Sequence, residues 1–161
     1  LALYDTLIIA SLTAREIDHF QDATGVASTL HNRYLAALGQ VQSDSAGYLG
    51  ADPTAQYARD TDTPPQDGHW WKPLADAGSK IATSNPYNTD AVADPSHRGL
   101  PPGPIAAPAW PEIVAAATPH PPAQWPYFYF AMDRCGTTHY AKTGVEFNAN
   151  VVPKLQSGNC P

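Results

Sequence analysis

RGLPPGPIAAP, residues 98–108, is the most informative stretch of this sequence. Its eleven residues include four prolines and two glycines, so it cannot form the interior of a helix or a central strand. Proline fixes φ and lacks a backbone donor, whereas glycine reaches φ values that other residues avoid. We therefore expect a stiff, extended wall whose backbone groups can meet a ligand. The alternative is that these prolines only mark turns.

The composition is that of one globular domain spanning residues 1–161. The chain has 161 residues, of which 43% are hydrophobic and 15% charged, and this is enough to bury a core. A net charge of −6 disfavours nucleic acid and anionic lipid as partners, because both need basic patches. No apolar run reaches the length of about 18 residues that a membrane span needs. The start without methionine suggests a mature or trimmed product, with a signal or anchor in the full-length protein.

The pattern of apolar and turn residues predicts an α+β fold: a helical domain with a small antiparallel sheet and long proline-rich loops. Helices are expected over residues 5–20, from 22 or 24 to 38, and over 54–59, 111–117 and 144–152. The aromatic run YFYFAM, residues 127–132, is the best strand, and residues 138–141 are its candidate hairpin partner. Because most of the 17 prolines lie between Pro64 and Pro126, the middle of the chain is expected to be rich in loops.

Two cysteines, Cys135 and Cys160, lie in the C-terminal part of the chain. A disulfide between them would hold down a terminus that otherwise frays, and it would indicate an extracytoplasmic protein. The alternative is a pair of free thiols in a cytosolic protein. The two cysteines lack the CxxC spacing, so they give little support to a metal site.

Glu16 is the candidate catalytic residue. At about 100° per residue it projects between Ile9, Leu12 and Phe20, on the apolar face of the first predicted helix. An unpaired carboxylate is costly there, so the carboxyl would have a raised pKa and remain protonated near neutral pH, as a general acid must. The alternative is a structural carboxylate at the rim of the face, or one paired with Arg15, His19 or Arg33.

The residue inventory argues against several other kinds of site. Glu16 and His19 have the spacing of two metal ligands on one helix, but a di-iron bundle needs more than the three glutamates present. No cofactor or metal is therefore expected. GxSxG and GxxxxGK[ST] motifs are absent, which disfavours serine hydrolases and P-loop enzymes. His139 is interpreted as a structural histidine rather than a catalytic base. The aromatic residues 125–130 are interpreted first as part of the core and second as a platform on which sugar rings stack.

Taken in chain order, the motifs resemble those of the endolytic murein transglycosylases, the MltG or YceG-like family. The matching segments are IASLTARE (9–16), GVASTLHNRYLAALGQVQS (25–43), DPTAQYA (52–58), SNPYNTD (84–90), GLPPGPIAAP (99–108), YFYF (127–130) and HYAKTGVEFNANV (139–151). The resemblance implies a peptidoglycan endolytic transglycosylase. Such an enzyme cleaves the β-1,4 bond between N-acetylmuramic acid and N-acetylglucosamine and leaves 1,6-anhydro ends.

The resemblance also implies roles for individual residues. Glu16 falls on the position of the single catalytic acid and base. One glutamate suffices because the C6 hydroxyl of the sugar replaces the water for which hydrolysing glycosidases need a second carboxylate. Candidates to bind the glycan strand are Gln42, Ser43, Asp52, Thr54, Gln56, Tyr87, Asn88, Gly99, Pro102 and Gly103. The alternative for the polar ones is local capping of loops. Residues 99–108 are expected close to Glu16, as one wall of the cleft.

The chain departs from the family pattern in one important place. The usual continuous QSDPT is interrupted after Gln42 and Ser43 by DSAGYLGA, residues 44–51. Asp44 is therefore an alternative to Asp52 as the motif aspartate, and the insertion could reshape or block the cleft. The family's membrane anchor and LysM-like portion are absent from residues 1–161.

The rival hypothesis is a catalytically silent peptidoglycan-binding or structural subunit of an extracytoplasmic assembly. In either case we expect an extracytoplasmic protein, periplasmic or at the cell surface. Its expected partners are glycan strands and proteins of cell-wall synthesis or of the envelope.

Overall fold

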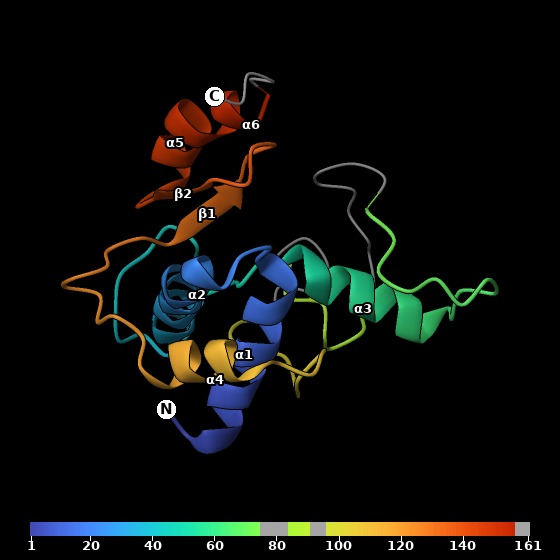
Figure 1. Ribbon diagram of the computed structural model, residues 1–161. Coiled ribbons are helices and arrows are strands. Elements are labelled where there is room, and N and C mark those ends of the chain that lie inside the picture. Colours follow the sequence, from blue (N-terminus) through green and yellow to red (C-terminus); the bar gives the residue numbers. More distant parts are fainter. Residues whose placement is uncertain (75–83, 91–95, 157–161) are drawn as a thin grey trace.

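Two long helices, α1 (Leu3–Glu16) and α2 (Ala23–Ala37), form the centre of the computed structural model, which describes residues 1–74, 84–90 and 96–156 (Figure 1). Their apolar stripes face each other, so that Ile9, Leu12 and Leu30 are completely buried. The short helix α4 (Trp110–Ala117) packs against both. Its contact face includes the buried pair Ala115 and Ala116, and such small side chains allow a close approach of the three helices.

The first helix is shorter than predicted. It ends at Glu16 rather than near Phe20, because Ile17 is extended with φ −118° and ψ 144°. Phe20 begins a 3₁₀ turn, Phe20–Asp22, and is 61% exposed. The expected apolar face therefore stops at Leu12, and Glu16 occupies the C-terminal end of the helix. The extended residues after Glu16 turn the chain back so that α2 can lie against α1.

Polar residues of α2 hold the segment that leads into the sheet. Ser28 Oγ accepts a hydrogen bond of 2.9 Å from the backbone N–H of His120. The completely buried Asn32 donates from Nδ2 to the carbonyl oxygens of Trp125 (2.6 Å) and Tyr127 (3.0 Å). Backbone groups of an irregular segment need such partners when they are buried. The side chains of α2 thus decide where the chain enters the sheet.

The sheet is the predicted hairpin of β1 (Tyr129–Met132) and β2 (Thr138–Ala141), with Tyr129 opposite Ala141. The strand β1 begins two residues later than predicted, since Asn32 occupies the carbonyl of Tyr127. The C-terminal helical region follows β2 as α5 (Gly144–Glu146), a π-helical stretch (Phe147–Val151) and α6 (Val152–Gln156). Figure 1 shows the hairpin and this region stacked above α2. The α+β fold class is confirmed.

The proline-rich residues 99–108 form no helix or strand, as predicted. The segment lies along the N-terminal part of α1, where the Tyr4 hydroxyl donates to the Pro102 carbonyl (3.3 Å). Further along α1, Ser11 Oγ accepts from the Ile105 N–H (3.1 Å). Gly103 lies so close to α1 that an added Cβ would come within 2.8 Å of the Tyr4 hydroxyl. This glycine therefore permits the close contact between the loop and the helix.

The remaining helix, α3 (Asp52–Asp62), is longer than the predicted 54–59 and carries a proline in its first turn, where the missing donor costs nothing. No helix among the described residues has the length and apolar character needed to cross a membrane. Cys160 lies outside the described residues, so the Cys135–Cys160 disulfide stays a prediction.

Candidate active site

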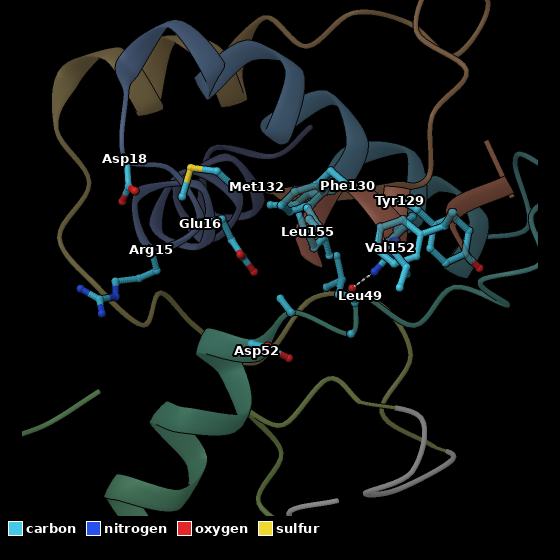
Figure 2. A pocket seen from close by; sticks show the side chains of 16 residues that line it. Arg15, Glu16, Asp18, Leu49, Asp52, Tyr129, Phe130, Met132, Val152 and Leu155 are labelled. Atoms are coloured by element: carbon cyan, nitrogen blue, oxygen red, sulfur yellow. Dashed lines mark hydrogen bonds between the residues drawn. The ribbon is translucent and has the colours of Figure 1, made fainter. Parts of the chain in front are cut away.

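A cavity of about 740 Å³ opens at the C-terminal end of α1 (Figure 2). The segment 49–52 lines one side, and β1 together with residues 147–155 lines another. Arg33 of α2 and Glu16 of α1 complete the cavity, so residues from both long helices, the insertion, the hairpin and the C-terminal region line it. The lining residues range from Arg15 to Leu155 in the sequence, so the tertiary fold is what brings them together.

Glu16 projects into this cavity and is partly buried (Figure 2). Among the residues that the structure describes, none forms a hydrogen bond or ion pair with its carboxyl, so the predicted alternative of pairing with Arg15, His19 or Arg33 is wrong. Burial raises the pKa of Glu16 to about 7, and the charge of Asp52 adds to the rise, whereas Arg33 and Arg15 oppose it. Glu16 therefore carries a proton in a substantial fraction of molecules at neutral pH, which is the state a general acid requires.

Asp52 places a second carboxyl in the cavity. It is the first residue of α3 and lies across the cavity from Glu16 in Figure 2. Partial burial raises the pKa of the Asp52 carboxyl, and the nearby charge of Asp90 raises it further. The prediction that Asp52 lines the site of Glu16 thus agrees with the structure.

Arg33 is a cavity residue that was considered in the sequence only as an ion-pair partner of Glu16. Its guanidinium donates to the carbonyl oxygens of Phe128 and Leu49 and lies over the Tyr129 ring, 4.7 Å from the ring centroid. Burial lowers the pKa of Arg33. A signal was present in the sequence, since Arg33 follows Leu30 by three residues on the buried stripe of α2. The same argument had singled out Glu16.

The insertion 44–51 forms a wall of the cavity and does not fill it. Asp44 accepts hydrogen bonds from the Tyr129 hydroxyl (3.0 Å) and the Gly144 N–H (2.7 Å). Burial and the hydrogen bond that the Tyr129 hydroxyl donates to Asp44 raise the pKa of Tyr129 to about 12. Asp44 itself does not line the cavity, whereas Leu49 and Asp52 do. Of the two candidate motif aspartates, Asp52 is therefore the one that faces Glu16.

Several predicted binding residues lie outside this cavity and make local contacts. Thr54 is buried, and its hydroxyl lies 2.8 Å from that of Thr89. Asn88 is buried and accepts from the Asp90 N–H (3.1 Å), as the loop-capping alternative predicts. The other four also lie elsewhere: Gln42 is exposed, Ser43 bonds to Ser45, Gln56 donates to the Lys72 carbonyl, and Tyr87 packs against the Tyr57 ring. The structure thus brings only Asp52 of this group to Glu16.

The lining of this cavity does not include residues 99–108, so their expected position as a wall beside Glu16 stays a prediction. Gly99, Pro102 and Gly103 do not line it. The Gly99 N–H donates to the Gly47 carbonyl of the insertion (2.9 Å), and the rest of the segment follows α1 from Tyr4 to Ser11. Glu16 is the last residue of that helix.

The described residues show no arrangement of metal-ligand type around Glu16. Because α1 ends at Glu16, His19 does not follow it on the same helix. Within residues 1–74, 84–90 and 96–156, no three His, Cys, Asp or Glu side chains gather as metal ligands would. His139 Nε2 lies 2.8 Å from Asp133 Oδ2, which fits the structural role expected for it.

Comparison with known proteins agrees with the fold and with the order of the motifs. The crystal structure of a YceG-like protein from Listeria monocytogenes matches with a TM-score of 0.66 and 26% sequence identity. The match covers 91% of this chain and 39% of the Listeria chain, so this chain spans about two fifths of that protein. No curated protein matches. The model of the YceG-like family matches residues 1–152, and the chain therefore belongs to the YceG-like family.

Proposed function

We propose that this protein is a lytic transglycosylase that cleaves the β-1,4 bond between N-acetylmuramic acid and N-acetylglucosamine in peptidoglycan. The observation that carries the proposal is Glu16, a carboxyl with a pKa near 7 that projects unpaired into a cavity of about 740 Å³. A cavity of that volume is within the usual range for ligand sites. Membership of the YceG-like family supports the same assignment.

In the proposed mechanism Glu16 acts first as acid and then as base. Its protonated carboxyl donates the proton to the glycosidic oxygen, and the bond between that oxygen and C1 of the muramic acid breaks. The C6 hydroxyl of the same sugar forms the new bond to C1. The Glu16 carboxylate then takes the hydroxyl proton, which restores the acid and leaves a 1,6-anhydro end.

Asp52 would act beside Glu16 in this reaction. Glycosidic cleavage develops positive charge at C1, and a carboxylate in the same cavity favours such charge. The pair of carboxyls also raises the question of hydrolysis, because a second carboxylate can activate a water molecule. The chemistry of the product ends separates these two reactions.

The test is the digestion of purified uncrosslinked glycan strands, with mass analysis of the product ends. Anhydro ends are expected from the parent protein, and reducing ends would show hydrolysis instead. Glu16→Gln keeps the size of the side chain but cannot transfer the proton, so we expect a loss of at least about 100-fold in rate. Glu146→Gln is the matched control, because Glu146 does not line the cavity and its carboxylate accepts a bond from the Lys142 backbone N–H. Unchanged cleavage by Glu16→Gln would overturn the proposal.

The same digestion addresses the binding-only alternative. Strands that bind to the parent protein without any product would support a catalytically silent subunit. The geometry favours the enzyme, since the insertion 44–51 leaves the cavity open beside Glu16. With this function, the protein would work outside the cytoplasm, on glycan strands and together with envelope proteins.

A further inference from the structure

Trp71 has a strained backbone that neighbouring side chains hold in place. Its φ of +67° lies in the left-handed region, which is unfavourable for a bulky residue. The Trp71 N–H donates to Asp60 Oδ2 (2.8 Å), and Asp60 is only 4% exposed. Arg59 in turn pairs with Asp60 at 2.7 Å and donates to the Lys72 carbonyl at 3.0 Å. Strain that is fixed by so many contacts is a mark of a functional position.

These contacts place the Trp71 ring against Arg15. The ring stacks on Tyr57, with centroids 5.8 Å apart and an angle of 30° between the planes. The Arg15 guanidinium lies over the Trp71 ring, 4.3 Å from its centroid. Trp71 therefore fixes one face of a cation that would otherwise sit on a flexible side chain.

This stacking leaves the hydrogen-bonding edge of Arg15 available. A guanidinium stacks through its flat face, whereas its five N–H groups point outward in the plane. No hydrogen bond or ion pair to Arg15 occurs among the described residues. Arg15 lines the cavity of Glu16, and Figure 2 shows its guanidinium turned away from the Glu16 carboxyl. The cation is thus held at the cavity without a carboxylate of its own protein.

We propose that Arg15, fixed by Trp71, binds a carboxylate of the substrate at the edge of the cavity that holds Glu16. This inference rests on the proposed function for the identity of the substrate. A guanidinium and a carboxylate form two parallel N–H···O bonds, which give both affinity and orientation. In a glycan strand such a carboxylate belongs either to the lactyl group of a denuded muramic acid or to a peptide stem. Arg15 is then a specificity residue, and Trp71 is the residue that positions it.

The test measures binding and not cleavage, in a Glu16→Gln background that stops turnover. Three ligands separate the sources: strands with peptide stems, denuded strands with free lactyl carboxylates, and neutral N-acetylglucosamine oligomers. Arg15→Met is expected to weaken binding of at least one carboxylate-bearing ligand about tenfold, because a bond to a charged group is lost. Binding of the neutral oligomer is expected to stay unchanged. Equal losses on all three ligands, or no loss on any, would overturn the proposal.

Two pairs of variants separate positioning from folding. Trp71→Leu removes the ring under Arg15 and is expected to weaken carboxylate binding as Arg15→Met does, with no further loss in the double variant. Trp71→Phe keeps an aromatic face and is expected to retain most of the affinity. Arg15→Lys keeps the positive charge but lacks the planar guanidinium, so its affinity for the carboxylate ligands is expected to lie between those of the parent and Arg15→Met. If the two single losses simply add, Trp71 does not act through Arg15.

The binding assay also distinguishes this inference from the proposed function. An Arg15-dependent preference for carboxylate ligands, in a protein that cleaves no strands, would overturn the enzyme and support the binding site. Normal cleavage to anhydro ends by the parent protein, with no preference for carboxylate ligands, would support the enzyme and overturn the carboxylate-binding site.

Discussion

At the scale of single residues, Glu16 derives its chemistry from its surroundings. A carboxyl with an ordinary pKa of 4.5 would be ionised at neutral pH, but burial at the end of α1 raises the pKa to about 7. The charge of Asp52 acts in the same direction, and Arg33 acts against it. The surroundings of Glu16 thus keep its carboxyl partly protonated at neutral pH, and the side chain can donate this proton to a ligand in the cavity.

This balance predicts the pH dependence of cleavage. Since the first step needs protonated Glu16, kcat/KM is expected to fall as the pH rises through about 7. Asp52→Asn removes the charge that helps to raise the pKa of Glu16, so the fall should move to lower pH. Asp62→Asn, at the other end of α3, serves as the control and should leave the profile in place. A profile that moves to higher pH in Asp52→Asn would contradict the electrostatic argument.

The raised pKa of Glu16 also predicts a change in stability. The folded state holds this proton between pH 4.5 and about 7, where the unfolded chain releases it, so the parent loses stability as the pH rises through that window. Glu16→Gln has no such loss. Its free energy of unfolding relative to the parent should therefore increase between pH 4.5 and pH 8, by at most about 3 kcal/mol. Urea denaturation at both pH values measures the difference, and a constant value would contradict the raised pKa.

At the scale of elements, α2 organises the site through contacts with the chain that returns to it. Asn32 and Arg33 hold backbone carbonyls of residues 125–128, and Arg33 also holds the carbonyl of Leu49. One helix therefore sets the position of both β1 and the insertion. This requires close packing between α2 and the hairpin, and Gly25 permits it because an added Cβ would come within 2.9 Å of the Tyr140 ring.

Gly25→Ala is expected to destabilise the protein by about 1 to 3 kcal/mol, because the new methyl group must displace the hairpin. The sign of this change in the free energy of unfolding is informative, because alanine in a helix interior otherwise stabilises by about 1 kcal/mol relative to glycine. Tyr140→Phe removes the hydroxyl that the methyl group meets first, so the cost should be smaller in that background. Thermal and denaturant unfolding of the four proteins measure it. A Gly25→Ala variant that is more stable than the parent would show that the hairpin does not press on α2.

At the scale of the whole molecule, the cavity is lined on one side by residues of the N-terminal helices α1 and α2 and on another by residues of the C-terminal third. Asp44 links the two parts, since it accepts from Tyr129 in β1 and from Gly144 at the start of α5. In Figure 1 this C-terminal region stacks above α2, and its residues 129–132, 147, 152 and 155 line the cavity. The cavity exists only when both parts are assembled.

Asp44→Ala is therefore expected to loosen the C-terminal part selectively. Amide hydrogen exchange should become faster in β1 and α5, whereas α1 and α2 should keep their protection. The exposed Asp67, which bonds within its own loop, offers the control variant Asp67→Ala. Faster exchange throughout the molecule would indicate global destabilisation and contradict a local link. Unchanged exchange in residues 129–146 would show that Asp44 does not hold the two parts together.

Local sequence patterns were sufficient for much of the fold. Period-four apolar residues located α2, the proline start located α4, and the aromatic run with its partner located the hairpin. The end of α1 was misjudged because Phe20 continues the apolar period, although the chain must turn there for α2 to pack. The start of β1 was misjudged because Asn32, far away in sequence, takes the carbonyl of Tyr127.

For the site, the sequence by itself singled out Glu16 as a carboxyl on the apolar face of the first helix, and the family resemblance named Asp52, with Asp44 as the alternative, for the same cleft. Both conclusions depend on local spacing and motif order, which are readable along the chain. Only the tertiary structure decided that Arg33, Tyr129 and the insertion line or border the cavity, that residues 99–108 pack along α1, and that Trp71 holds Arg15. These contacts join segments that are distant in sequence, and their geometry depends on how the elements pack rather than on the residues within any one of them.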